Sequence, residues 1–239
     1  MARSLRWSER RLGDERTLER RIEGATFLFA LGPPSRGFDP GRRVAAVERH
    51  LGCRVHSVHW LRQVHGTGLV DVTGTDVGGC AGTGDGLLTS DSRRGILVWT
   101  ADCVPLLLAF PRGIAAVHAG WRGAAEGIVG RAVERLCPVG SDRDRGHAVL
   151  GPAISGSRYE VGPEVVEALS GQPVDPVRWQ LGPHHVDLRG FVAAQLEVLG
   201  IPPERIEMIP RCTASDPTLA SFRRDGDRAG RQWSMVFRR

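Results

Sequence analysis

Three side chains in this sequence combine residue types and local settings that suit metal chemistry. His65 precedes a glycine at the end of an expected strand, His118 ends a second expected strand, and Cys103 lies beside a strongly apolar run. Two imidazoles and one thiolate can hold zinc in an open tetrahedral site whose fourth position takes water or substrate. The three residues lie far apart in the chain and match no local metal signature. Their spacing alone therefore favours a buried thiol and hydrogen-bonded histidines.

The same residues also suit chemistry without a metal. Cys103 could act as a nucleophile with His118 as its base, and backbone N–H groups between Gly120 and Gly123 could bind an oxyanion. The residue types do not distinguish the metal site from the thiol nucleophile, so both hypotheses stay open at this point.

Four further residues are candidates for substrate binding. Arg122, Arg223 and Arg224 could clamp an anion such as phosphate, although a solvated surface position is the commoner outcome for an arginine. Tyr159 is the only tyrosine and lies among glycine-rich turns, so we expect either a role in the site or ordinary half-buried packing.

Other polar residues have simpler expected roles. Asp85 is expected to be a turn residue, and Asp102 a hydrogen-bond acceptor at a strand end. Four more histidines are assigned to the surface or to packing: His56, His59, His184 and His185.

The composition is typical of a globular protein and excludes several classes. Of the 239 residues, 41% are hydrophobic and 25% charged, and no apolar run approaches the roughly 18 residues of a membrane span. All 32 cationic residues are arginines, but they form no dense basic stripe with interleaved aromatics, so nucleic acid is not an expected partner. The five cysteines show no CxxC pair and the start of the chain is charged. These features predict reduced thiols and a cytoplasmic protein without a signal peptide.

The elements that must position the candidate residues follow from the apolar pattern. Nearly unbroken runs at 95–99 and 104–110 predict central strands buried on both faces, with Cys103 between them. A third strand at 114–117 leads through a turn into a helix over 124–136, the kind of joint where α/β proteins place ligands. Partial alternation over 55–71 predicts one or two strands, with His59, Leu61, Gln63 and His65 on one face if extended. A glycine-rich loop is expected over 78–86.

The rest of the chain predicts an α+β protein with one compact domain, residues 25–239. Residues 1–24 are expected to form a charged N-terminal arm, either a solvated helix or a floppy segment. Strands are expected at 25–31, 148–150, 206–209 and 233–237, and helices at 43–51, 163–169 and 188–199.

Seven motifs occur in the order seen in one protein family. They are Gln63-Val64-His65-Gly66, Asp85-Gly86-Leu87-Leu88-Thr89, Ala101-Asp102-Cys103-Val104-Pro105, Ala116-Val117-His118-Ala119-Gly120-Trp121-Arg122-Gly123, Gly151-Pro152-Ala153-Ile154 with Tyr159-Glu160-Val161-Gly162, Cys212-Thr213, and Ser221-Phe222-Arg223-Arg224. The chain is identified as a member of the family first labelled multicopper polyphenol oxidase, or laccase domain. That family is now associated with purine nucleoside phosphorylase activity and, in some members, with peptidoglycan editing. The resemblance covers about residue 55 to the C-terminus.

The resemblance implies a fold, a metal and a reaction. The fold is a layered sandwich of mixed β-sheets covered by helices, and the metal is zinc held by His65, Cys103 and His118, the same residues that would be catalytic. The implied reaction is phosphorolysis of adenosine, inosine and 5′-methylthioadenosine, with adenosine deamination at the same site. Purine nucleosides and phosphate are then the expected partners. The guanidinium chemistry, not the resemblance, suggests the hypothesis that Arg122 with Arg223 or Arg224 holds the phosphate.

The front of the chain departs from the family pattern. Members usually carry a Thr-Arg followed by a Gly-Gly turn and, further on, an Asn-Arg pair. Here residues 27–38 read FLFALGPPSRGF and the chain contains no asparagine. Arg36 is a candidate substitute. The resemblance therefore does not extend to the front wall of the pocket or to substrate preference.

Three other functions compete with this interpretation of the sequence. A multicopper oxidase needs about ten histidine ligands, largely in HxH pairs, whereas this chain has eight histidines and no HxH. Copper at the three candidate ligands would be adventitious and give weak oxidation in vitro. The main rival is an amide hydrolase that edits peptidoglycan precursors with Cys103 as nucleophile. A third candidate is a non-enzymatic protein whose arginine-rich arm, residues 3–21, docks on an acidic partner.

Overall fold

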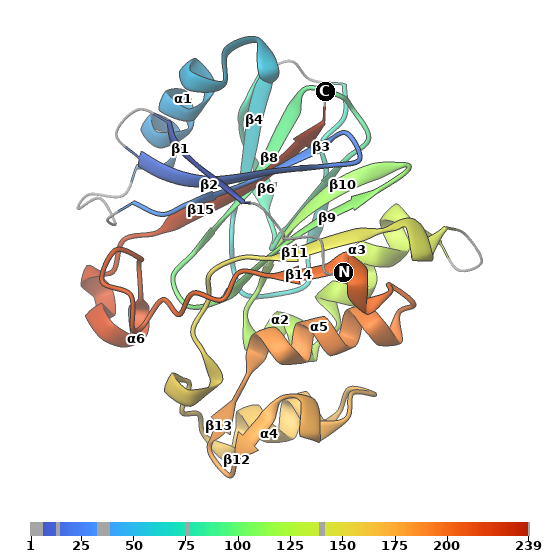
Figure 1. The fold of residues 1–239 in the computed structure, drawn as a ribbon, viewed down its shortest axis with the longest axis vertical. Helices are drawn as coiled ribbons and strands as arrows, with labels where there is room; N and C mark the ends of the chain where they lie inside the picture. Colours follow the sequence, from blue (N-terminus) through green and yellow to red (C-terminus); the bar gives the residue numbers. More distant parts are fainter. Residues whose placement is uncertain (1–6, 13–14, 33–38, 75–76, 139–141, 239) are drawn as a thin grey trace.

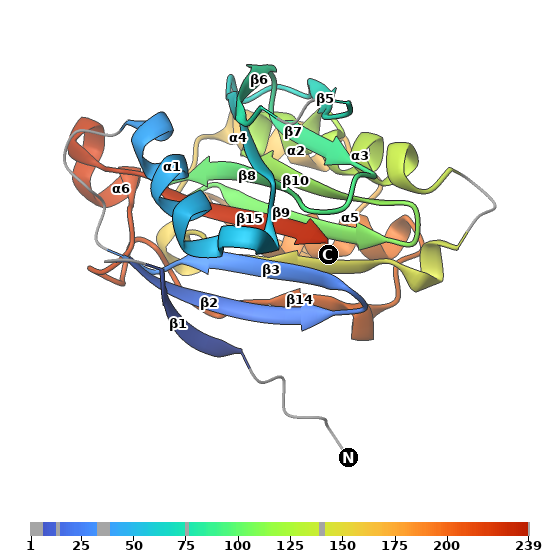
Figure 2. The same cartoon turned by 90° about the horizontal axis from the view of Figure 1, so that it is seen from above.

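The protein is built from two large β-sheets packed face to face, with helices on both outer sides (Figures 1 and 2). The computed structural model describes residues 7–12, 15–32, 39–74, 77–138 and 142–238. This arrangement confirms the predicted α+β layered sandwich. Over the described part of the chain, no helix is both long and apolar enough to cross a membrane.

Seven strands form the first sheet and six form the second. The spatial order of the first is β1 (Ser8–Leu12), β2 (Glu15–Ile22), β3 (Ala25–Ala30), β15 (Gln232–Arg238), β8 (Arg94–Thr100), β4 (Ser57–Arg62) and β6 (Gly79–Thr83). The order of the second is β14 (Ile206–Met208), β11 (His147–Leu150), β9 (Val104–Phe110), β10 (Gly113–Ala119), β7 (Gly86–Thr89) and β5 (Leu69–Asp71). A small hairpin pairs β12 (Gln180–Gly182) with β13 (His185–Val186).

Helices cover the outer face of each sheet. Helix α1 (Pro40–Leu51) packs on the seven-stranded sheet through Val44, Val47 and Leu51. Four helices pack with the six-stranded sheet: α2 (Trp121–Ala125), α3 (Ile128–Leu136), α4 (Pro163–Ser170) and α5 (Leu188–Val198). The short helix α6 (Phe222–Asp225) precedes the last strand.

The central strands alternate their side chains between two apolar cores. In β8, Ile96 and Val98 face the core between the sheets, whereas Leu97 lies in the core beneath α1. In β9, Leu107 points between the sheets and Leu106 toward the helical layer. Because both faces are buried, both faces are apolar, which explains the unbroken hydrophobic runs. The predictions of buried central strands at 95–99 and 104–110 are confirmed.

The predicted helix over 124–136 is two helices. Gly127 has φ +87°, a left-handed conformation that suits glycine, and it separates α2 from α3. Helix α2 also begins earlier than expected, at Trp121, directly after the end of β10. The predicted strand–turn–helix joint is therefore present, and it is tighter than the sequence pattern indicated.

The expectation of a solvated helix or a floppy segment at the N-terminus is wrong for the described residues. Strands β1 and β2 pair with each other, and β2 pairs with β3. A two-residue turn with positive φ at Glu23 and Gly24 joins β2 to β3, the conformation that matches the twist of a hairpin. The charged side chains instead form ion pairs, for example Arg54 with Glu19 and Arg20 with Glu207.

Two further expectations are corrected in the middle of the chain. Residues 79–83 of the expected glycine-rich loop form β6, an edge strand parallel to β4. The shared face for His59, Leu61, Gln63 and His65 is also wrong, because β4 ends at Arg62 and His65 has φ +61°. Residue Arg36, a candidate for the front wall, lies outside the described residues.

Candidate metal centre

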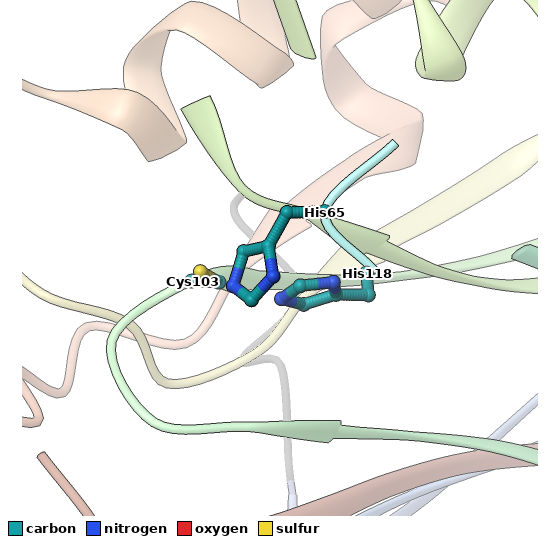
Figure 3. A group of neighbouring side chains, drawn as sticks. All are labelled: His65, Cys103 and His118. Atoms are coloured by element: carbon teal, nitrogen blue, oxygen red, sulfur yellow. The ribbon is translucent and has the colours of Figure 1, made fainter. Parts of the chain in front are cut away.

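His65, Cys103 and His118 come together where the two sheets meet. One ligand atom from each residue lies within 4.8 Å of the others, and the two imidazole rings meet edge to face (Figure 3). His65 follows strand β4 of the first sheet, and His118 belongs to β10 of the second. Cys103 lies in the short link from β8 to β9, which crosses between the sheets. The fold thus assembles three residues that the sequence separates.

The Asp85 carboxylate organises two of these residues. Its oxygens accept hydrogen bonds from the backbone N–H groups of Val64, His65 and Gly66, the latter two at 2.9 and 2.8 Å. One oxygen also accepts the Nδ1–H of His118 at 2.8 Å, so Nε2 is the nitrogen that remains for Cys103 or a metal ion. Asp85 is fully buried, so these contacts replace its hydration. The same carboxylate holds the left-handed backbone at His65 and orients His118.

Cys103 and His118 strongly influence each other's protonation. Burial raises the pKa of the Cys103 thiol, but the charge and hydrogen bonds of His118 and His65 outweigh burial and lower this pKa to about 6. Burial lowers the pKa of His118, but the Cys103 thiolate and Asp85 raise it to about 9. Burial likewise raises the pKa of Asp85, and hydrogen bonds from His118, Gly66 and His65 bring it below its usual value. The site therefore favours a thiolate at neutral pH.

The residue next to Cys103 fixes the link between the sheets. Asp102 is buried and has φ +88°, an unusual conformation for a residue with a side chain. Its carboxylate accepts hydrogen bonds from the Thr213 hydroxyl at 2.5 Å and from the backbone N–H of Arg223 at 2.7 Å. The expected role of strand-end acceptor is confirmed. This contact also attaches α6, which carries Arg223, to the Cys103 segment.

Gly120 leaves room beside all three candidate ligands. A Cβ atom at this position would lie 3.2 Å from Cδ2 of His65, 3.3 Å from Sγ of Cys103 and 3.9 Å from Cε1 of His118. The backbone of Gly120 is extended, with φ −75°, so its conformation does not require glycine. Glycine is instead needed here because any side chain would crowd the three candidate ligands.

A cavity of about 750 Å³ opens beside the three residues. Its wall includes aromatic rings from Trp60, Trp99, Tyr159 and Phe222. Guanidinium-bearing side chains also line it, namely Arg62, Arg223 and Arg231. Aromatic surfaces with a few polar groups are typical of a pocket for a small-molecule ligand.

The structure brings two of the four predicted substrate residues to this cavity. Tyr159 and Arg223 line it, with the Arg223 guanidinium 5.3 Å from the Tyr159 ring centre. Arg122 is exposed, stacks on Trp121 at 4.2 Å and is not among the residues that line the cavity, although its charge acts on Tyr159. The Arg224 guanidinium donates to backbone oxygens of Thr213, Asp216 and Leu219. It also pairs with Asp225, so its donors are engaged within the fold.

Sequence reasoning missed three residues of this site. Asp85 lies in the bend between β6 and β7, as the sequence predicts, but its hydrogen bonds to the His65 loop and His118 are not predicted. The signals that could have pointed to it are its place at the start of a quoted motif and the preceding glycine with φ +157°. Arg62 and Arg231 line the cavity from β4 and from the segment before β15. Nothing in the local sequence distinguishes these two arginines from the many others in the chain.

Comparison with known proteins places the chain in a family. A family model described as "Multi-copper polyphenol oxidoreductase laccase" matches residues 41–239. A purine nucleoside phosphorylase of Mycobacterium tuberculosis is 40% identical over 94% of this chain and 95% of its own length. A protein named adenosine deaminase RL5, from an unknown prokaryote, is 37% identical over 65% of this chain and 62% of its own length.

Solved structures agree with this assignment. The YfiH protein of Bacillus licheniformis has a TM-score of 0.79 at 23% identity, over 93% of this chain and 96% of its own, and supports the fold alone. YlmD of Geobacillus stearothermophilus has a TM-score of 0.77 at 25% identity, over 100% of this chain and 98% of its own. The motifs, the fold and the near full-length relatives agree, and the chain belongs to the multi-copper polyphenol oxidoreductase laccase family.

Proposed function

We propose that the protein is a zinc-dependent purine nucleoside phosphorylase for adenosine, inosine and 5′-methylthioadenosine, with adenosine deaminase activity at the same site. The observation that carries this proposal is the His65–Cys103–His118 cluster on the wall of a cavity lined by aromatic rings and arginines. Relatives named purine nucleoside phosphorylase and adenosine deaminase support it. The thiols of Cys80, Cys103 and Cys212 support a cytoplasmic location, where thiols stay reduced.

The donor set fits zinc. Two imidazole nitrogens and a thiolate, all within 4.8 Å of one another, match the ligand types of an open catalytic zinc site. The Asp85–His118 hydrogen bond is the carboxylate–histidine arrangement that commonly supports such ligands. Zinc held there supplies a Lewis acid and lowers the pKa of a water in the open position.

The cavity residues suit the two proposed reactions. In phosphorolysis, a phosphate oxygen bonds to C1′ of the ribose as the bond from C1′ to the purine nitrogen breaks, and the base leaves with a proton. Trp60, Trp99 or Phe222 can stack on the purine, and Arg223 can hold phosphate through its guanidinium. In deamination, water adds at the purine carbon that carries the amino group, and ammonia leaves.

The decisive experiment measures purine-base release from the three nucleosides, with and without phosphate. Metal-analysed wild-type protein is compared with a Cys103→Ala variant prepared in parallel. We expect phosphate-dependent release by the zinc-loaded wild type and its loss in the variant. No release from any of the nucleosides by a folded, zinc-loaded protein would refute the proposal.

A specific observation also favours the second candidate, an amide hydrolase acting on peptidoglycan precursors. Asp85, His118 and Cys103 form a continuous chain in which a buried carboxylate orients the imidazole beside a thiol of lowered pKa. This candidate requires activity without metal and covalent trapping of Cys103 by substrate. If a chelator abolishes turnover while circular dichroism shows an intact fold, the thiol mechanism is excluded.

A further inference from the structure

A second, basic pocket of about 430 Å³ adjoins the main cavity. Arg223 lines both of them. The other polar residues around the smaller pocket are Ser157, Arg158, Glu160, His185 and Arg224. The shared Arg223 places this pocket next to the proposed active site.

The wall between the two cavities is one short segment with Arg223 against it. Tyr159 lines the main cavity, whereas its neighbours Arg158 and Glu160 line the smaller pocket. The Arg223 guanidinium stacks on the Tyr159 ring and donates one hydrogen bond to the Glu160 backbone oxygen at 2.8 Å. Its remaining N–H groups have no hydrogen-bond partner among the described residues. They are therefore available to a ligand.

The charge of the smaller pocket is positive. Arg158 is exposed and makes no ion pair or side-chain hydrogen bond with any described residue. Arg224 is already paired with Asp225, and Glu160 is the one carboxylate among the described residues of the lining. The lining thus contains two guanidinium groups without an ion-pair partner in the described part of the chain, those of Arg158 and Arg223, and one carboxylate, that of Glu160. Guanidinium forks match the oxygens of phosphate groups.

We propose that this pocket is a subsite for a phosphate group, held by Arg158 and Arg223 beside the main cavity. This subsite goes beyond the proposed function and rests on it, because phosphorolysis needs a phosphate close to the nucleoside. The phosphate group comes either from inorganic phosphate or from a phosphate ester, such as a nucleoside 5′-monophosphate.

The test is calorimetric titration of the full-length zinc-loaded protein with inorganic phosphate and, separately, with adenosine 5′-monophosphate. The variant is Arg158→Gln, and the control is Arg131→Gln, which removes the same charge from an exposed position on α3. We expect Arg158→Gln to weaken binding of at least one ligand about five- to tenfold. The control should bind both ligands like the wild type.

The pattern of losses identifies the source of the phosphate group. Weaker binding of inorganic phosphate assigns the pocket to the free anion, and weaker binding of the monophosphate alone assigns it to an ester. Unchanged affinity for both ligands in Arg158→Gln overturns the subsite, even if the wild type cleaves nucleosides. A loss of affinity in a protein that cleaves none would keep the subsite and refute the proposed function.

Discussion

A single carboxylate, Asp85, makes two distant parts of the chain behave as one site. It binds three consecutive backbone N–H groups around His65 and the imidazole of His118. The loop that carries His65 therefore has its conformation before any ligand arrives. Such preorganisation reduces the entropy cost of closing a metal site.

Replacing Asp85 with Asn tests this role. The amide retains one acceptor oxygen but cannot accept all four hydrogen bonds, so both histidines lose orientation. We expect zinc affinity to fall by about 10- to 100-fold, measured by competition with a chromophoric chelator. Asp144→Asn, at an exposed position, is the control. Equal zinc affinity in Asp85→Asn and wild type would contradict the positioning role.

The lowered pKa of Cys103 predicts a distinctive pH dependence of thiol alkylation. The thiolate is the reactive form, so reactivity rises as pH rises through the pKa. In metal-free protein, the rate at which iodoacetamide alkylates Cys103 should rise through about pH 6 and level off above pH 7. The extent of alkylation is measured by mass spectrometry of the peptide that contains Cys103.

A His118→Ala variant is the matching control for alkylation. It removes the cation that stabilises the thiolate, and the midpoint should move above pH 7 because the opposing effect of burial stays. An unshifted midpoint would show that His118 does not control this thiol.

The sequence around each residue was enough to predict the three candidate metal ligands. It was not enough to predict the residues that form hydrogen bonds with them. His118 and Cys103 stand at the ends of strongly apolar runs, and the motif resemblance singled out all three ligands. Asp85 could not be identified in this way, because its hydrogen bonds reach residues about 20 and 33 positions away. The engagement of Arg224 by backbone oxygens is likewise a product of the folded chain.

The β10–α2 joint positions the His65 loop through close backbone packing. Gly123 lies in the first turn of α2, and a Cβ atom there would lie 2.6 Å from the backbone oxygen of Gly66. That oxygen belongs to the loop held by Asp85 and cannot move independently of it. The helix and the ligand loop are therefore in direct backbone contact.

A Gly123→Ala substitution should disturb both stability and the site. We expect the free energy of unfolding to fall by about 1–3 kcal/mol from overpacking, measured by urea denaturation, together with weaker zinc binding. Gly130→Ala in α3 is the control, because its Cβ would make only an ordinary contact with Leu199 at the end of α5. That variant should gain about 0.5–1 kcal/mol of stability. If both variants unfold at the same urea concentration, the close contact is unimportant.

The elements that could be predicted are those whose burial leaves a pattern of apolar residues in the sequence. Strands β8, β9 and β10 are apolar because both faces are covered, and the periodicity of α1 follows from its one buried face. Strands β1 and β6 have mostly exposed side chains and owe their conformation to pairing with β2 and β4. Pairing leaves little signal in a sequence when neither face is deeply buried.

The two ends of the chain are connected through Glu15. Its carboxylate accepts a hydrogen bond from the Trp233 indole at 2.5 Å and pairs with Arg43 of α1. Arg43 also donates to the backbone oxygen of Arg231 and lies 5.7 Å from the Trp99 ring centre. Strand β2, helix α1 and strand β15 are thereby joined behind the cavity wall.

Removing the Glu15 side chain should destabilise the whole protein. Glu15→Ala leaves the Arg43 charge and the Trp233 N–H without this partner. We expect a loss of about 2–4 kcal/mol in the free energy of unfolding, measured by chemical denaturation. Glu9→Ala breaks only an exposed pair with Arg16 and should cost less than about 1 kcal/mol. Similar decreases in the free energy of unfolding in the two variants would show that the Glu15 contacts contribute no more than an exposed ion pair.

The placement of the three candidate ligands couples metal binding to the stability of the folded protein. His65 comes from one sheet, His118 from the other, and Cys103 from the link between them. A metal ion held by all three binds only the state in which the sheets are packed together. At a free metal concentration of 100 times the dissociation constant, such binding adds about 2.7 kcal/mol to stability. The lifetime of the folded chain in a cell would then follow the supply of metal, independently of any substrate.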